Sequence, residues 1–174
     1  MLIGNYTTEF VHLACGSESG TPDLVIRLDR DISEVIPYLN TVLGGFQYTK
    51  EPRSVSFRLN GKLAVIHPRK ICITAPGDRL EAEKIIEWLR DKINDTWERR
   101  DEIEPRFESV ASPKVLEILR LLPKTNCGLC GEQTCMVFAS QAAKGVKAPD
   151  DCPPLNGEQK TKLTKYLGQF EVRS

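Results

Sequence analysis

The sequence contains little that would support acid–base or nucleotide chemistry. Among its 174 residues there are only two histidines, His12 and His67, which leaves little scope for general-base catalysis by imidazole. It has no Ser/His/Asp constellation and no pair of acids that marks a cleft. Gly16 and Gly20 do not form a phosphate loop, because no Gly-Lys-Ser/Thr follows them. We therefore expect a protein that is not an enzyme in its own right.

Net charge and long apolar runs are also missing. The chain has 24 basic and 24 acidic residues, so bulk electrostatics indicate neither nucleic acid nor an anionic membrane as a partner. Its apolar runs are only a few residues long, too short to span a bilayer. With no signal peptide, we expect a cytoplasmic protein.

Four of the six cysteines are concentrated in the last third of the chain. Their spacing is C-x2-C-x4-C-x16-C, with Pro153 directly after the last, and they are Cys127, Cys130, Cys135 and Cys152. Three thiols within nine residues, and a fourth returned by a short helical segment, can converge on one point. This pattern predicts a metal site.

The residues around these cysteines favour an iron–sulfur cluster. Gly128 and Gly131 follow the first two cysteines, where a chain that wraps a bulky inorganic core must turn tightly, and glycine reaches positive φ without steric cost. Their bare backbone also lets amide N–H groups approach the sulfurs of a negatively charged cluster. Residues 135–144 form a good helical segment whose positive N-terminal end would face the cluster. All four thiolates fit one [4Fe–4S] cube.

Two other uses of these cysteines remain open. A structural zinc site with four thiolate ligands usually shows paired C-x2-C knuckles, whereas this sequence has one such pair, a close third cysteine and a fourth followed by proline, as in ferredoxin-type runs. Disulfides are the third alternative. Six cysteines without a signal peptide argue instead for a reducing compartment.

Residues 122–139 (LPKTNCGLCGEQTCMVFA), closed by Asp151-Cys152-Pro153, resemble a known module. It is the four-cysteine [4Fe–4S] domain at the N-terminus of the large subunit of the corrinoid iron–sulfur protein, which also occurs in the B subunit of Rnf-type electron-transport complexes. The resemblance covers about residues 113–155 and matches all four ligand positions. It implies that the module passes single electrons at low potential and that the ligands are Cys127, Cys130, Cys135 and Cys152.

The remainder of the chain departs from both families. No barrel follows the module, and the cobalamin signature Asp-x-His-x-x-Gly is absent, since the only histidines are His12 and His67. The Rnf subunit would need a membrane anchor, for which the short apolar runs offer no candidate.

Two classes of function follow. We expect an electron-transfer module that accepts an electron from a ferredoxin-like donor and passes it to a redox protein partner. By resemblance, that partner is a corrinoid protein or another anaerobic one-carbon enzyme, and the N-terminal part of the chain supplies docking. The alternative is a binding or assembly protein in which the metal, zinc or a cluster, is structural.

The first hundred residues predict an α+β domain in which helices cover an antiparallel sheet. Branched residues at 24–28 indicate a strand, and apolar residues within 32–43 recur at helical spacing, with Ser33 as the N-cap and Gly44 at the stop. Pro37 then falls in the first turn, where its missing N–H costs nothing.

An Asn60-Gly61 dipeptide separates two apolar-rich runs, residues 54–59 and 62–66. This is a strong hairpin signal, because a type I′ turn needs positive φ at both central positions. A two-residue turn pairs Phe57 with Ala64 and leaves Leu63 on the opposite face, which must be covered unless a bulge intervenes.

A further strand at residues 70–74 precedes a long helix. Asp78 and Glu81 predict a capping box at its start. Its apolar stripe consists of Leu80, Ile85, Ile86, Leu89, Ile93 and Trp97. The order strand–helix–strands–helix resembles, in topology only, one half of a TATA-binding-protein-like fold.

The charged residues 98–112 predict a solvated helix end that runs into a linker. We place the boundary near Pro105, which gives an α+β domain at residues 1–106 and a helical cluster module at residues 107–174. The module begins with Pro113 at a first helical position. A tail helix is indicated by Leu163, Tyr166, Leu167 and Phe170, whose spacing favours packing on the module.

The remaining conspicuous residues have simple interpretations. Cys72 lies in an apolar strand pattern, where free cysteine behaves as a small hydrophobe. Cys15, near His12, is a loop cysteine that could be reactive or bind a second metal, although no partner ligands have suitable spacing. Trp88 and Trp97 are expected to pack the long helix.

Overall fold

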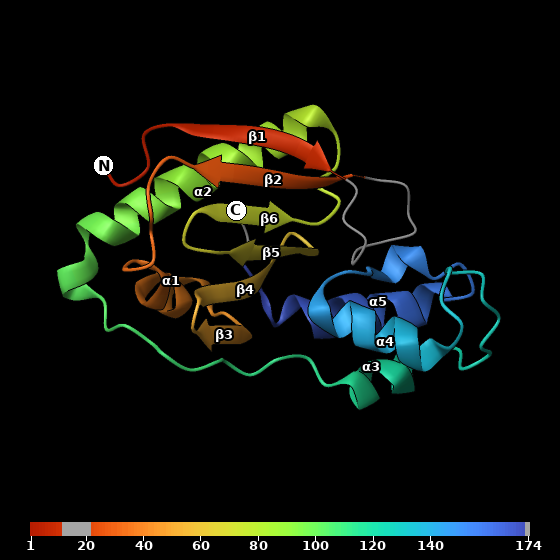
Figure 1. Ribbon diagram of the computed structural model, residues 1–174. Helices are drawn as coiled ribbons and strands as arrows, with labels where there is room; N and C mark the ends of the chain where they lie inside the picture. The colour runs from red at the N-terminus through yellow and green to blue at the C-terminus, as the bar shows by residue number, and fades with distance from the viewer. Residues whose placement is uncertain (12–21, 173–174) are drawn as a thin grey trace.

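The computed structural model describes residues 1–11 and 22–172, which form an α+β fold (Figure 1). In chain order the elements are β1 (Tyr6–Val11), β2 (Asp23–Leu28), α1 (Ile36–Leu43), β3 (Gln47–Lys50), β4 (Arg53–Leu59), β5 (Lys62–Ile66), β6 (Lys70–Ile73), α2 (Arg79–Glu98), the 3₁₀ turn η1 (Arg100–Glu102), α3 (Val115–Leu121), α4 (Cys135–Lys144), the 3₁₀ turn η2 (Pro149–Asp151), α5 (Gly157–Gly168) and β7 (Glu171–Val172). No helix of the described residues combines the length and apolar character needed to cross a bilayer.

The sheet has the strand order β1-β2-β6-β5-β4-β3, and all neighbours in this path are antiparallel. One face packs against α1 and α2 around a core built from alternate strand residues such as Ile26, Phe57 and Ile73. Strand β7 adds to β4 in parallel. The TATA-binding-protein-like topology stays a prediction.

The predicted hairpin is confirmed. Asn60 and Gly61 have φ values of 50° and 78°, as a type I′ turn requires, and Phe57 pairs with Ala64. The opposite face is covered as well, because Gly145, at the end of α4, lies against the backbone of Leu63.

The predicted start of the first helix is wrong. Helix α1 begins at Ile36, and Val35 occupies the N-cap without a side-chain hydrogen bond. Ser33 instead lies in a turn, where its N–H donates to the Asp31 carboxylate at 2.9 Å. Pro37 does fall in the first turn, and the helix stops at Gly44, which has φ +61°.

The start of α2 agrees with the prediction in part. Asp78 caps the helix and accepts from the Glu81 N–H at 2.8 Å, but the Glu81 carboxylate pairs with Lys62 of β5 instead of closing the capping box. Leu80 is wrongly placed in the apolar stripe, since it is 68% exposed. The first turn of α2 projects past the core, which the helix first reaches at Ala82. The predicted packing of Trp88 and Trp97 on this core is confirmed.

The charged linker is bound along α1 and β3. The N–H of Arg106 donates to the carbonyl of Pro37 at 3.0 Å, and that of Val110 donates to Gly45 at 2.8 Å. Asn40, buried in α1, donates to the carbonyls of Arg106 and Glu108. Sequence periodicity could not reveal these contacts, because backbone groups make most of them. The boundary near Pro105 stays a prediction.

A second hydrophobic core lies in the C-terminal part of the described chain. It consists of Ile118, Leu122, Cys135, Phe138, Ala139, Ala142, Ala143, Cys152, Leu163 and Leu167. Helix α5 therefore packs on the cysteine segment, as its spacing predicts. Helix α3 begins later than expected: Lys114 is its N-cap, so Pro113 precedes the helix.

Arg58 joins the two parts of the structure. This β4 residue is 1% exposed and points away from the sheet core, donating to the carbonyl of Ala142 near the C-terminal end of α4. The Nη2 atom of Arg58 lies 3.7 Å from Oε1 of Glu171 in β7. Figure 1 shows α3, α4 and α5 grouped beside the β4 side of the sheet, where these contacts occur.

We expect Arg58→Ala to lower the free energy of unfolding by about 2–4 kcal/mol, because it leaves a buried carbonyl and a half-buried carboxylate without their cation. Arg58→Met should cost less, since it keeps the packing and removes a charge whose burial already lowers its pKa. Urea unfolding followed by fluorescence of Trp88 and Trp97 measures both. Equal losses in the two variants would contradict this account.

Candidate metal centre

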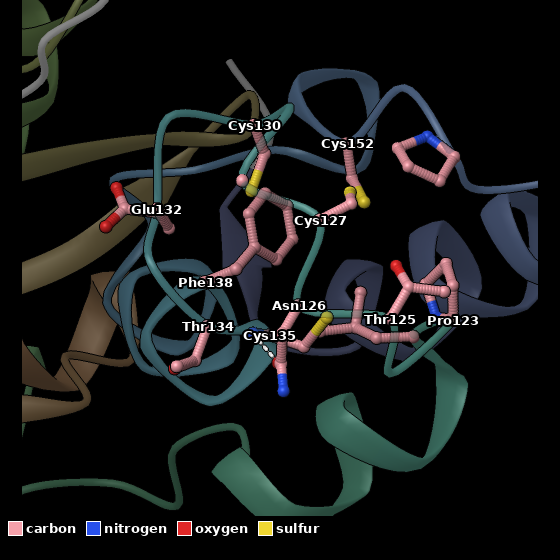
Figure 2. A pocket seen from close by; sticks show the side chains of 13 residues that line it. Pro123, Thr125, Asn126, Cys127, Cys130, Glu132, Thr134, Cys135, Phe138 and Cys152 are labelled. Atoms are coloured by element: carbon pink, nitrogen blue, oxygen red, sulfur yellow. Dashed lines mark hydrogen bonds between the residues drawn. The ribbon is translucent and has the colours of Figure 1, made fainter.

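The four predicted cysteine ligands line one cavity. Cys127 and Cys130 come from the loop after α3, Cys135 from the first turn of α4, and Cys152 from the residue after η2. In the view of Figure 2, the sulfurs of Cys127, Cys130 and Cys152 lie in the upper part of the group of lining side chains, and the sulfur of Cys135 lies below them.

The loop that carries the first two cysteines turns as its glycines predict. Gly128 and Gly131 have φ values of 72° and 83°, which only glycine adopts without cost. The N–H of Gly131 donates to the carbonyl of Gly128 at 3.0 Å and closes the turn. Leu129 lies at the tip of this loop and is 68% exposed.

Two polar residues fix the start of α4 and with it Cys135. Thr134 is the N-cap and accepts from the N–H of Val137 at 3.2 Å. The side chain of Asn126 accepts from the N–H of Cys135 at 2.8 Å, a contact drawn in Figure 2. Asn126 has φ 48°, and this positive angle brings its amide back over the helix start. Its position directly before Cys127 was the available sequence signal, and pattern analysis missed it.

Cys152 is positioned by the tight turn η2. The carboxylate of Asp151 accepts from the N–H of Ala148 at 2.7 Å, and the N–H of Cys152 donates to the carbonyl of Pro149 at 3.3 Å. Cys152 itself is only 8% exposed. The chain between α4 and α5 therefore returns the fourth thiol to the cavity, as the spacing predicts.

The cavity thiols interact electrostatically with one another. Burial raises the pKa of the Cys152 thiol, and the nearby thiolates of Cys130, Cys135 and Cys127 raise it further. By contrast, hydrogen bonds lower the pKa of the exposed Cys127 thiol. The largest contribution comes from the backbone N–H of Leu129, and the next from the side chain of Thr125. Thiolates this close repel one another unless a cation or cationic core binds between them.

The donor set fits an iron–sulfur cluster. Four soft thiolates line the cavity, and sulfur ligation is what iron–sulfur clusters require. Among residues 1–11 and 22–172, no group of three or more His, Cys, Asp or Glu side chains is arranged to hold a single metal ion.

Cys72 lies apart from this cavity. Cys72 of β6 pairs with Val25 and Val65, and burial raises its pKa, which fits a small hydrophobic residue. Cys15 and His12 lie outside the described residues, so the interpretation of Cys15 stays a prediction.

Sequence analysis also missed Lys147. This residue is 7% exposed, and its ammonium reaches the loop that carries Cys130. A lysine in a loop carries no periodic signal, and only its spacing of five residues before Cys152 sets it apart.

Comparison with protein families identifies the class of this site. Residues 122–154 match a family model described as "Putative Fe-S cluster". These residues contain all four cavity cysteines. The segment is therefore similar to an iron–sulfur cluster domain.

Curated relatives match about a third of the chain. The gamma subunit of the acetyl-CoA decarbonylase/synthase complex of Methanothermobacter thermautotrophicus is 46% identical over 52 residues, which are 30% of this chain and 11% of that protein. The corresponding subunit of Methanosarcina acetivorans is 53% identical over 56 residues, 32% of this chain and 12% of the relative. The match thus spans no more than about an eighth of the length of these relatives. No solved structure matches the chain significantly.

Proposed function

We propose that this chain binds one [4Fe–4S] cluster and serves as an electron-transfer protein for an anaerobic one-carbon enzyme. The proposed ligands are Cys127, Cys130, Cys135 and Cys152. When bound, such a cluster takes up and releases one electron. We propose no catalytic step for the chain itself.

The observation that carries this proposal is the single cavity lined by all four thiols within the matched iron–sulfur segment. The order of the ligands along the chain supports it, because three come from one short loop and helix start and the fourth is brought back by η2. Helix α4 also directs its positive N-terminal end toward this cavity, where it would stabilise a negatively charged group.

The surface over the cavity supports transfer to a protein partner. Cys127 is exposed at the cavity mouth, and beside it Leu129 projects into solvent. Two further exposed apolar residues, Met136 and Val137, lie in the first turn of α4. Small apolar surfaces of this kind suit brief redox encounters, which bury little area.

The proposed partner is a redox protein of one-carbon metabolism, with a corrinoid protein or a ferredoxin as the candidates. The relatives that match about a third of this chain carry the name of an acetyl-CoA decarbonylase/synthase complex subunit, which supports this choice. We propose that the α+β domain at residues 1–106 provides docking, since the cluster module is fixed to its sheet through Arg58.

Anaerobic reconstitution with iron and sulfide tests the redox part of this proposal. We expect a brown protein with broad visible absorbance that bleaches with dithionite and returns on reoxidation. A preparation that stays colourless and retains zinc would favour the alternative, a structural metal in a binding or assembly protein.

We expect Leu129→Glu to slow electron exchange with a low-potential ferredoxin by about tenfold or more, because a charge at the centre of the contact must be desolvated on docking. Stopped-flow absorbance measures the rate. Iron content and visible spectrum should match the wild-type protein, since the side chain is exposed. Leu116→Glu, on an exposed leucine of α3 that does not line the cavity, is the matched control. Equal rates in both variants would place docking elsewhere.

A further inference from the structure

Lys147 is a buried lysine beside the cysteine loop. Its Nζ donates to the carbonyl oxygen of Cys130 at 3.2 Å and lies 3.7 Å from Oε1 of Glu132. Lysine is almost never buried without a partner, because its ammonium must leave water. The position of this charge, between a ligand residue and a carboxylate, indicates a role at the cysteine cavity.

The chain brings Lys147 to this place by a sharp reversal after α4. Gly145 ends the helix with φ +82°, and the N–H of Val146 donates to the carbonyl of Gln141 at 2.9 Å. The side chain of Lys147 then reaches the loop with Cys130 and Glu132, two residues that line the cavity. Its ammonium therefore lies directly behind the cavity wall.

The groups of this wall have opposite electrostatic effects on a bound cluster. A [4Fe–4S] core with four thiolates is negative, and reduction adds one further negative charge. A cation held nearby in a poorly solvated site stabilises the reduced form, and an anion destabilises it. Lys147 and Glu132 supply one charge of each sign, with side-chain exposures of 8% and 21%.

We infer that Lys147 is a positioning residue that also sets the reduction potential of this site. It holds the loop at Cys130 through the carbonyl contact, and its ammonium raises the potential that the carboxylate of Glu132 lowers. The inference rests on the proposed [4Fe–4S] cluster and adds to it the residues that tune it.

Spectroelectrochemical titration of the reconstituted full-length chain tests this inference. Lys147→Met should shift the redox equilibrium about tenfold toward the oxidised form. For a one-electron couple, this makes the reduction potential about 59 mV more negative. Glu132→Gln should shift it in the opposite direction. Lys147→Arg, which keeps the charge, should restore a potential near that of the wild-type protein. Lys144→Met removes an exposed lysine of α4 and should leave the potential nearly unchanged.

The opposite signs separate a charge effect from a merely structural one. Shifts of the same sign in Lys147→Met and Glu132→Gln, or equal shifts in Lys147→Met and Lys144→Met, would overturn the inference. If Lys147→Met fails to hold a cluster, the potentials of Glu132→Gln and Lys147→Arg test the inference instead. An unchanged potential in Glu132→Gln then overturns the inference. A wild-type protein that binds no [4Fe–4S] cluster would overturn the proposed function as well, and is seen before any variant is compared.

Discussion

Replacing any one of the four cavity cysteines by serine should remove most of the bound iron or leave a three-iron cluster. Each thiolate holds one corner of the proposed cube, and a serine hydroxyl is a much harder, more basic donor than a thiol. We expect the largest loss with Cys135→Ser and Cys152→Ser, because these two side chains also belong to the second hydrophobic core. Iron analysis and electron paramagnetic resonance of each variant, reconstituted in parallel, give the result.

Cys72→Ser and Cys15→Ser are the matched controls for this series. Cys72 lies on β6, away from the cavity, and should change iron content little. Cys15 has no ligand-like spacing to other cysteines. Loss of iron in Cys15→Ser would show that the ligand set is wrong.

Removal of the cluster should unfold the cysteine module while the sheet stays folded. The core that joins α3, α4 and α5 is small and contains Cys135 and Cys152, so it buries too little surface to be stable alone, and binding energy becomes folding energy. The core under the sheet contains none of the ligands. Hydrogen exchange with mass spectrometry should therefore show, after chelation under anaerobic conditions, faster exchange by orders of magnitude in α3–α5 and little change in β2, β4 and β6.

The tryptophans provide an independent check of this prediction. Trp88 and Trp97 both lie on α2 and pack on the sheet core, so their fluorescence should change little when the metal is removed. Unchanged exchange in α4 and α5 after complete removal of iron would contradict the dependence of the module on its cluster.

The elements that sequence analysis predicted are those specified by local chemistry. Asn60-Gly61 allows few backbone conformations other than a type I′ turn, so both the hairpin and its register could be predicted from the sequence. Similarly, the cysteine spacing and the helix at residues 135–144 were sufficient to gather four thiols around one cavity.

The missed features depend on contacts between distant parts of the chain. Strand β7 is two residues long, and only its partner β4 defines it as a strand. Leu80 has helical spacing, but its burial depended on where the core begins. Arg58 and Lys147 look like surface charges in the sequence, and each becomes buried because another segment covers it and offers an oxygen.

The central claim is that the four thiols hold a four-iron cluster, and Mössbauer spectroscopy combined with metal and sulfide analysis tests it most directly. The account predicts about four iron atoms and four sulfides per chain after anaerobic reconstitution, with a spectrum of a single cubane type that changes reversibly on one-electron reduction. One zinc ion per chain and no sulfide, in protein purified without exposure to air, would contradict it.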